Sequence, residues 1–372
     1  MGGAPVTSID YSDIQGLVRF GYKRLTEATY ALVRVKSAPA ARTWLRAAPI
    51  ATAQVQDPSP TAALQVAFTA AGLEMIGVPA TVIASFSPEF LGGMTDPNRS
   101  RRLGDLGAND PSKWEWGIET QSPHLLIMFF AAPGGLEGCV KDLTGPAWDQ
   151  AFEEIGWLYT ADLDGVEPFG FTDGISQPAI DWEQARDTSA AVIDYTNLSA
   201  LGEFLLGYRN EYGKYTDRPV IDSDAVSAQL PAAEDAPEKK DVGRNGTYLV
   251  VRQLRQDVRG FWQFVRQQAA GDPERGLHFI CVNANICRQF EFLQNAWMTS
   301  SKFSGLTGET DPLVGGRSPI PGGPVTADFT IQQDGRPPAR VSGLPQFVTV
   351  RGGAYFFLPG IRALRYFASV KE

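Results

Sequence analysis

The order of strand-like and helical segments is the feature that most constrains this chain. Residues 28–36 are rich in β-forming residues, residues 39–47 have helical composition, and strand-like stretches follow at 50–56 and 63–69. A helical stretch at 70–77 precedes the apolar run HLLIMFFAA at 124–132, which is typical of a buried strand. The order β-α-β-β-α-β, with an insertion at roughly 87–121 before the last strand, predicts a ferredoxin-like unit.

The second half predicts a unit of the same kind. We expect strands at 246–254 and 276–282, helices at 257–268 and 285–297, and a long surface loop at 215–245. FVTV and AYFFL, on either side of Arg351-Gly352-Gly353, predict a hairpin before a last helix that begins at Pro359. The two helices carry apolar stripes, formed by Val258, Phe261, Trp262 and Val265 in the first and by Ile286, Phe290, Leu293 and Trp297 in the second. The expected fold class is α+β, with antiparallel sheets in an N-terminal unit (1–165) and a C-terminal unit (166–372).

Composition excludes several classes of protein. The 372 residues suffice for about two domains, and 43% hydrophobic with 20% charged residues is typical of a globular protein. A net charge of −9 disfavours nucleic acid as a partner. The beginning, MGGAPVTSIDYSDIQG, has no secretory pattern, and the longest apolar run, 125–132, is too short to span a bilayer. Three scattered cysteines, Cys139, Cys281 and Cys287, predict reduced thiols, so we expect a cytoplasmic protein without a membrane segment.

The stretch EPFGFTDGISQPAI at 167–180 sets one acid, Asp173, in a short turn bounded by Gly170 and Gly174. Asp-Gly pairs are common in tight turns, because glycine takes positive φ freely and aspartate bonds its own backbone. The alternative is that the glycines bring the backbone close to a large flat group, with one carboxyl group directed at it. An isolated Asp-Gly favours the structural turn.

Further segments accompany this turn in a fixed order: DVGRNGTYLVVRQLRQDV, RGLHFICVNANICRQFEFLQNAW and RGGAYFFLPG. Together with GFTDGISQP, and with DIQGLVRFGY and RRLGDLGANDPSKWEWG nearer the beginning, they resemble the dye-decolourising (DyP-type) haem peroxidases over nearly the whole chain. The resemblance implies two ferredoxin-like units in a chlorite-dismutase-like, dimeric α+β barrel architecture, with haem in the second unit.

The resemblance also implies roles for particular residues. Asp173 matches the distal acid, which moves a proton between the two oxygens of hydrogen peroxide, and such a group must lie within hydrogen-bond reach. Leu277 and Phe279 match apolar residues that line the distal pocket. Gly170, Gly174 and Ile175 belong to the turn that would approach the cofactor.

One segment of the family pattern is missing. The family has a histidine on iron and a distal arginine in a long segment between the helix and the strand that match DVRGFWQFV and RGLHFICV. Here only RQQAAGDPE spans that interval, and it contains no histidine. Of the two histidines, His124 opens a strand of the first unit, and His278 lies between Leu277 and Phe279. Because side chains alternate along a strand, His278 is expected on the face opposite to these two residues.

Other iron ligands are not favoured by the sequence. Cys281 is expected on the same strand face as Leu277 and Phe279, so its thiolate is a conceivable iron ligand. A cysteine in such a position is more commonly a buried apolar residue. No Ser-His-Asp order, P-loop or HExxH motif is present, and paired acids such as Glu153-Glu154, or Glu89 and Asp96, fit ordinary surface.

Three functions remain open on this evidence. The first is a DyP-like subunit that has lost its own haem ligand and supports peroxide-dependent oxidation of an organic reductant together with a haem-bearing chain. In that case no cofactor is expected in the isolated chain, and its partner is a haem-bearing DyP-like chain or a second copy. The second is an autonomous peroxidase with an unexpected iron ligand. The third is a cofactor-free protein that binds a small ligand on the same fold.

Overall fold

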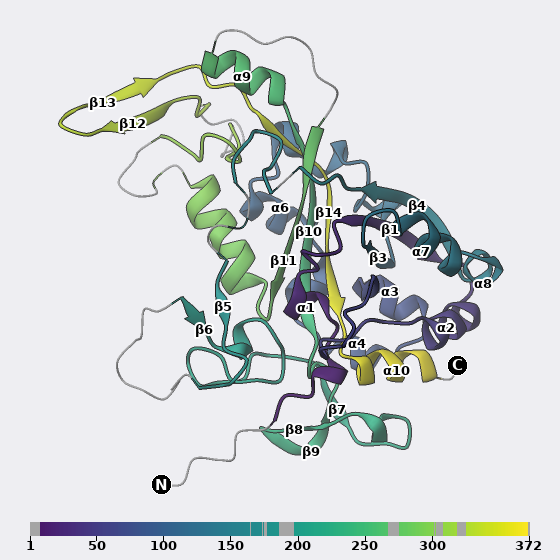
Figure 1. Cartoon of the computed structure of the whole chain (residues 1–372). Helices are drawn as coiled ribbons and strands as arrows, with labels where there is room; N and C mark the ends of the chain where they lie inside the picture. The colour runs from purple at the N-terminus through teal and green to yellow at the C-terminus, as the bar shows by residue number, and fades with distance from the viewer. Residues whose placement is uncertain are drawn as a thin grey trace.

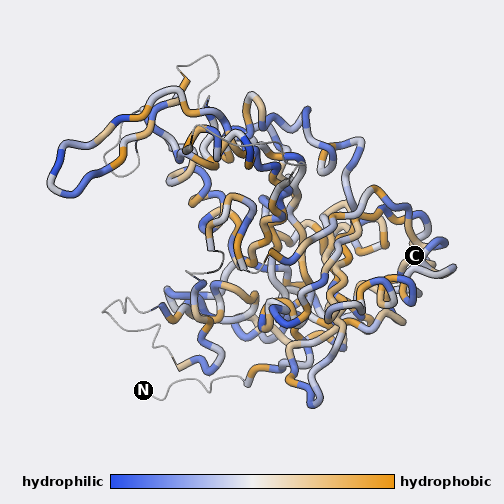
Figure 2. Tube along the Cα trace, turned by 45° about the horizontal axis from the view of Figure 1, so that its top comes forward, coloured by the Kyte–Doolittle hydropathy of each residue, from blue (hydrophilic) through white to orange (hydrophobic). Residues whose placement is uncertain are grey.

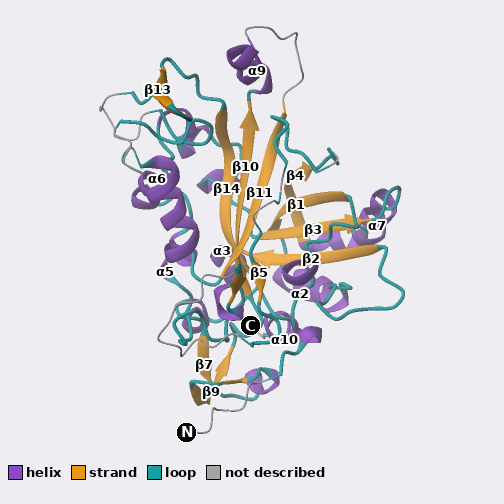
Figure 3. Ribbon diagram, turned by 60° about the vertical axis from the view of Figure 1, so that its left-hand side comes forward, coloured by secondary structure: helices purple, strands orange, loops and turns teal. Residues whose placement is uncertain are grey.

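A single antiparallel sheet of seven strands joins the two halves of the chain, in the order β11-β10-β14-β2-β3-β1-β4. The computed structural model describes residues 8–163, 165–172, 174, 177–185, 197–266, 275–300, 302, 308–317 and 325–370. Figure 1 shows their arrangement, and Figure 3 shows that β10, β11 and β14 run at a steep angle to β1, β2 and β3. The α+β fold class expected from the sequence is confirmed.

The N-terminal unit contributes four of these strands. They are β1 (Glu27–Val35), β2 (Ala62–Phe68), β3 (Leu125–Ala131) and β4 (Phe152–Tyr159), in the ferredoxin-like order β2-β3-β1-β4. Every residue of β3 is buried, as the run of apolar residues predicts. The helices of this unit are α1 (Leu17–Phe20), α2 (Ala38–Ala47), α3 (Ala70–Met75), α4 (Ala80–Ile83), α5 (Pro88–Gly92), α6 (Pro97–Leu103), α7 (Leu136–Leu143) and α8 (Pro146–Ala151).

The assignment of strands within this unit needs two corrections. Residues 50–56 form only isolated bridges, from Ile50 to Leu64 and from Thr52 to Gln15, and not a strand. The fourth strand is β4, which the sequence analysis missed. Exposed Glu153 and Glu154, together with Gly156, hide its β character, because β4 is the last strand of the sheet order and much of it faces solvent.

The C-terminal unit contributes β10 (Thr247–Gln256), β11 (Arg275–Asn283) and β14 (Val348–Leu358), with α9 (Val258–Arg266) and α10 (Ile361–Ser369). A single register pair, Phe357 with Phe68, joins β14 to β2. Smaller elements are β5 (Ala179–Ile180), β6 (Leu198–Ser199), β7 (Val220–Asp222), β8 (Ala232–Ala233), β9 (Ala236–Asp241) and the protruding hairpin of β12 (Phe329–Gln333) and β13 (Arg336–Val341). Figure 2 shows hydrophobic chain gathered in the central sheet and a hydrophilic tip on that hairpin.

The expected hairpin around Arg351-Gly352-Gly353 is wrong, because β14 passes through these residues as one strand. A Cβ on Gly352 would lie 2.4 Å from Nε1 of Trp116, and one on Gly353 would lie 2.8 Å from Sδ of Met94. Gly352 and Gly353 therefore leave room for the side chains of Trp116 and Met94 to pack against the strand. The two glycines do not form a turn.

Two further expectations are corrected. The loop expected at 215–245 contains the small sheet β7-β9-β8, and a buried ion pair of 2.6 Å joins Arg218 Nε to Asp241 Oδ2 beside it. The helix expected at 285–297 forms, but with π-helical turns at Cys287–Glu291 and Gln294–Thr299. Wider turns displace an i, i+4 stripe around the axis, and accordingly Ile286 and Phe290 are buried whereas Leu293 and Trp297 are exposed.

Both faces of the sheet are buried. One face carries a core that extends through both units and includes Val33, Phe129, Tyr248 and Phe357, and the other carries a second core that includes Leu32, Phe130, Val251 and Phe356. Strands β11 and β4, at the two ends of the strand order, approach each other, since His278 of β11 bonds the backbone of Tyr159 in β4. In the part of the chain that the structure describes, no helix is both long and apolar enough to cross a bilayer.

Candidate functional site

The described part of the 166–174 turn is organised by a carboxylate that the sequence analysis did not single out. Glu167 accepts hydrogen bonds from the backbone N–H groups of Phe171 (2.9 Å) and Phe169 (3.0 Å). Its Oε2 also accepts a bond of 2.5 Å from the side-chain amide of Gln256, at the end of β10. Glu167 thus fixes the loop conformation and fastens it to the sheet. The one available signal was an acid directly before a Pro-x-Gly turn.

The turn packs on helix α9. The ring centroids of Phe169 and Phe261 lie 4.6 Å apart, and those of Phe171 and Phe261 lie 6.0 Å apart. Gly170 has φ 96° and Gly174 has φ 75°, a region that favours glycine strongly. A Cβ on Gly170 would meet Trp262 at 3.7 Å, an ordinary contact, so backbone conformation and not crowding by the described residues requires glycine there. Asp173 and Ile175 lie outside the described residues.

Leu277 and Phe279 lie on the face of β11 that packs toward the core shared by both units. Phe279 contacts Phe290 with ring centroids 6.0 Å apart, and Cys281 packs against the same core. Leu277 pairs in register with Leu254 of β10, which packs both against this core and against the cluster that contains Phe169. Leu254 therefore lies between the turn that contains Phe169 and the part of β11 that contains Leu277.

The same face carries a buried ion pair. Arg252, in register with Phe279, bonds the carboxylate of Asp105, and both side chains are almost fully buried. Burial raises the pKa of Asp105, and the Arg252 charge opposes that shift. Trp114 covers the guanidinium, at 5.8 Å from the ring centroid.

A second buried carboxylate, Glu291, lies at the helix facing this sheet. Its Oε1 accepts bonds from Arg99 Nη1 (2.7 Å) and from the Tyr355 hydroxyl (3.1 Å), and its Oε2 accepts one from Arg102 Nη1 (2.8 Å). Ligand atoms of Glu89, Cys287 and Glu291 lie within 4.8 Å of one another, a spacing that a metal ion could bridge. Both oxygens of Glu291 already bind arginine, so this cluster is an ion-pair network of the insertion with the C-terminal unit.

Neither of the two histidines lies on the Phe279 face. His278 directs its ring to the opposite face, where Nε2 donates to the carbonyl oxygen of Tyr159 at 3.1 Å and the ring meets Tyr30 edge-on, with centroids 6.2 Å apart. The parity expected for His278 is thereby confirmed. His124 lies in the N-terminal unit, where its Nδ1 accepts a bond of 3.0 Å from the backbone N–H of Val35. Burial lowers the pKa of both imidazoles.

Cys281 is the remaining soft ligand on the Phe279 face. Burial raises the pKa of its thiol to about 12, which favours the protonated form at neutral pH. A thiolate, and not a thiol, is the form that binds metals, so Cys281 behaves here as an apolar core residue.

A polar cavity of about 290 Å³ opens beside His278. Its walls are formed by β10, β11, β14 and Tyr159, and they include Glu115, Gln253, Arg255, His278 and Arg351. The side chains of Glu115 and Arg351 pair across it, with 3.6 Å between Oε1 and Nε. The cavity lies where β11 and β4, the strands at the two ends of the sheet order, approach each other.

Comparison with known proteins shows which proteins this chain is similar to. No protein-family model matches the chain. The dye-decolorizing peroxidase of Exidia glandulosa is 24% identical over 96% of this chain and 87% of its own length. The multifunctional dye peroxidase of Amycolatopsis sp. is also 24% identical, over 81% of each chain. A solved structure of an ancestral D-type dye-decolorizing peroxidase has a TM-score of 0.70 at 18% identity, covering 98% of this chain and 100% of that chain.

The fold is thus that of the dye-decolorizing peroxidases, and the sequence relationship runs through nearly the whole chain. The chain is therefore similar in sequence to DyP-type peroxidases over nearly its whole length and shares their fold.

Proposed function

We propose that this chain is a DyP-type peroxidase subunit that has no haem ligand of its own and supports peroxide-dependent oxidation together with a haem-bearing chain. The observation that carries the proposal is the position of the histidines. The sequence contains two, His124 and His278, and neither faces the sheet surface that carries Leu277 and Phe279. A histidine-ligated haem on that surface does not fit the residues present.

The packing of this surface supports the same conclusion. Phe279 is in contact with Phe290, and the neighbouring carboxylates, Asp105 and Glu291, are bonded to arginines. Replacing these contacts by a cofactor would expose buried charges, at a cost of several kcal/mol for each ion left unpaired. A haem held by a second chain would leave these ion pairs of this chain intact.

Exposed aromatic surface supports association with that second chain. Phe171, Phe292 and Trp297 are each about half exposed although they belong to the turn and to the helix beside the site. Apolar area contributes roughly 25 cal/mol per Å² when it is buried, so a chain that covers these side chains is stabilised on binding. We expect a haem-bearing DyP-like protein to cover these side chains in the active assembly, whereas a second copy of this chain would cover them without providing haem.

The test is the haem content of the purified full-length chain, expressed alone and together with a haem-bearing DyP-type peroxidase. We expect little haem absorption from the chain alone, co-elution with the second protein, and peroxidase activity above that of the haem protein by itself. Near-stoichiometric haem in the chain alone would overturn the proposal.

An autonomous peroxidase is the second candidate, because the relative from Exidia glandulosa matches 96% of this chain and is named a dye-decolorizing peroxidase. It requires an iron ligand other than a histidine on the Phe279 face. Stoichiometric haem that is lost in Cys281→Ala, or in His278→Ala, would establish it and identify the ligand.

A further inference from the structure

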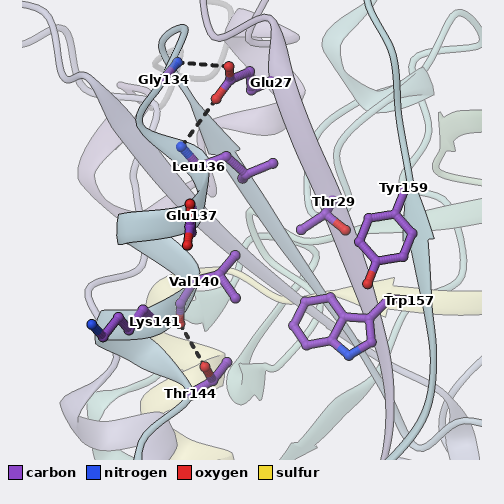
Figure 4. Close-up of a pocket in the computed structure, with 10 residues that line it drawn as sticks. All are labelled: Glu27, Thr29, Gly134, Leu136, Glu137, Val140, Lys141, Thr144, Trp157 and Tyr159. Carbon is purple, nitrogen blue, oxygen red and sulfur yellow. Dashed lines mark hydrogen bonds between the residues drawn. The ribbon is translucent and has the colours of Figure 1, made fainter.

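A further cavity lies in the N-terminal unit, and neither Leu277 nor Phe279 lines it. It is an open groove of about 720 Å³ between helix α7 and strands β1 and β4. Sites for small organic ligands have volumes of roughly 300–1,000 Å³. Figure 4 shows ten lining residues: Glu27, Thr29, Gly134, Leu136, Glu137, Val140, Lys141, Thr144, Trp157 and Tyr159.

The groove exists because helix α7 does not cover the last strand of the sheet. Helix α7 packs on β3 and β1, and the face of β4 on the same side of the sheet is left uncovered by this helix. Trp157 and Tyr159 lie on that face, in register with Ala31 and Thr29 of β1. Leu136 and Val140 form the opposite wall, and Figure 4 shows their side chains directed from α7 toward Thr29 and Trp157.

Trp157 is held as a fixed aromatic platform. Its indole stacks on Trp148, with centroids 6.2 Å apart and planes inclined by 25°, and it contacts Phe129 at 5.8 Å. Its Nε1 donates to Oε2 of Glu154 at 2.9 Å, and Oε1 of the same carboxylate accepts from Trp148 at 3.1 Å. The indole N–H is satisfied and the ring orientation is set, so binding against the ring costs little side-chain entropy.

Tyr159, a residue that is 74% exposed, supplies a second aromatic ring at the mouth of the groove. Aromatic rings attract cations through the negative charge of their faces, and tryptophan does so most strongly. The charged lining side chains are Glu27, Glu137 and Lys141, two negative charges against one positive, a net of −1. Figure 4 shows the Lys141 ammonium group directed away from both rings.

We propose that this groove binds a small aromatic cation, such as an aryl ammonium compound, with its ring between the apolar wall of α7 and Trp157. The apolar walls accept the ring, the two aromatic side chains and the negative lining favour the positive charge, and the volume accommodates a molecule of that size. The site is separate from the proposed peroxidase function and does not depend on it.

The experiment measures binding to the purified full-length chain by calorimetry, with three probes of similar size: phenyltrimethylammonium, 4-ethylphenol and benzenesulfonate. We expect phenyltrimethylammonium to bind tightest and benzenesulfonate weakest. Tyr159→Ala should weaken phenyltrimethylammonium by about tenfold, equivalent to about 1.4 kcal/mol. Because the Tyr159 side chain is exposed and His278 contacts only its backbone carbonyl, the fold should be retained.

Two further variants make the result decisive. Tyr212→Ala removes another exposed tyrosine, 70% exposed and outside the groove, and should leave binding unchanged. Glu137→Lys changes the net charge of the lining from −1 to +1 and should reverse the preference between the cationic and anionic probes. Equal affinity for all three probes, or binding that is the same in Tyr159→Ala as in the parent chain, would overturn the proposal.

Discussion

His278 of β11 donates a hydrogen bond of 3.1 Å from Nε2 to the backbone carbonyl oxygen of Tyr159 in β4. These two strands occupy the two ends of a seven-stranded order, so the contact joins the C-terminal edge of the sheet to its N-terminal edge. His278, between Leu277 and Phe279 in the sequence, thus contributes a contact between the two edges of the sheet.

The first prediction concerns the pH dependence of this junction. Nδ1 of His278 has no hydrogen-bond partner among the described residues, and burial lowers the pKa of the ring below its ordinary value of 6.5. The groups around it are Tyr30, Tyr159, Gln253 and the arginines of the adjoining cavity, and none of these is an acid. Glu115 lines the same cavity but pairs with Arg351.

Because the unfolded chain binds this proton more readily, the free energy of unfolding should fall as pH decreases below about 6.5 and be insensitive to this group above it. Urea titrations between about pH 5 and 8 measure the slope. His278→Gln should flatten it, and His124→Gln should do so in part, because the pKa of His124 is also lowered. An unchanged slope in both variants would contradict the assignment.

The second prediction concerns the buried carboxylate of Glu291. Glu291→Ala leaves Arg99 and Arg102 without their shared acceptor and Tyr355 without its hydrogen bond. Breaking a buried pair from one side costs roughly 3–5 kcal/mol. Chemical denaturation should show a loss of that size. The control is Arg340→Ala, which breaks an exposed pair with Asp328 and should cost less than about 1 kcal/mol.

The third prediction tests the glycines of β14. Gly352→Ala places a Cβ 2.4 Å from Trp116 Nε1, whose hydrogen bond to the Gln253 side chain fixes the indole. Overpacking of this kind typically costs 1–3 kcal/mol. Gly156→Ala, in β4, is the matched control, since no atom beyond the adjoining residues of the chain lies within 4 Å of the added methyl group. A similar midpoint of thermal unfolding for the two variants would contradict this prediction, because it would show that Trp116 moves aside without loss of stability.

The fourth prediction concerns Asp173 and rests on the proposed subunit role. In a mixture of this chain with a haem-bearing DyP-type chain, Asp173→Asn should lower peroxidase activity if this chain supplies an acid to the reaction. General acid–base groups typically contribute about 10²–10⁴-fold. Co-elution of the two chains should persist, which separates catalysis from assembly. Full activity with the variant would assign the turn a structural role.

Much of the architecture follows from local sequence alone. The apolar run of β3, the strands β1, β10 and β11, and the helices α2, α9 and α10 are all apparent from periodicity and composition, because each has a strong local pattern. The parity of Leu277, His278 and Phe279 also follows from the sequence, since strand geometry alternates faces whatever the surroundings.

Other features depended on residues distant in the chain. Gly352 and Gly353 predict a turn locally, yet they lie in a continuous strand because Trp116 and Met94 pack against them. Strand β4 has a weak local signal and forms because β1 offers it a paired edge. The pairing of Glu291 with Arg99 and Arg102, almost 200 positions away, likewise has no local signature.

The sequence by itself determined the periodicity of the strands and helices and the motifs that resemble the DyP-type peroxidases. It also limited the possible histidine ligands to two residues. The tertiary structure alone decided that Glu167 holds the turn, that His278 contacts the opposite edge of the sheet, and that α7 leaves Trp157 and Tyr159 in an open groove. The physical reason is range: alternation and helical period are properties of neighbouring residues, whereas burial, ion pairing and cavities arise only when distant segments compete for the same space.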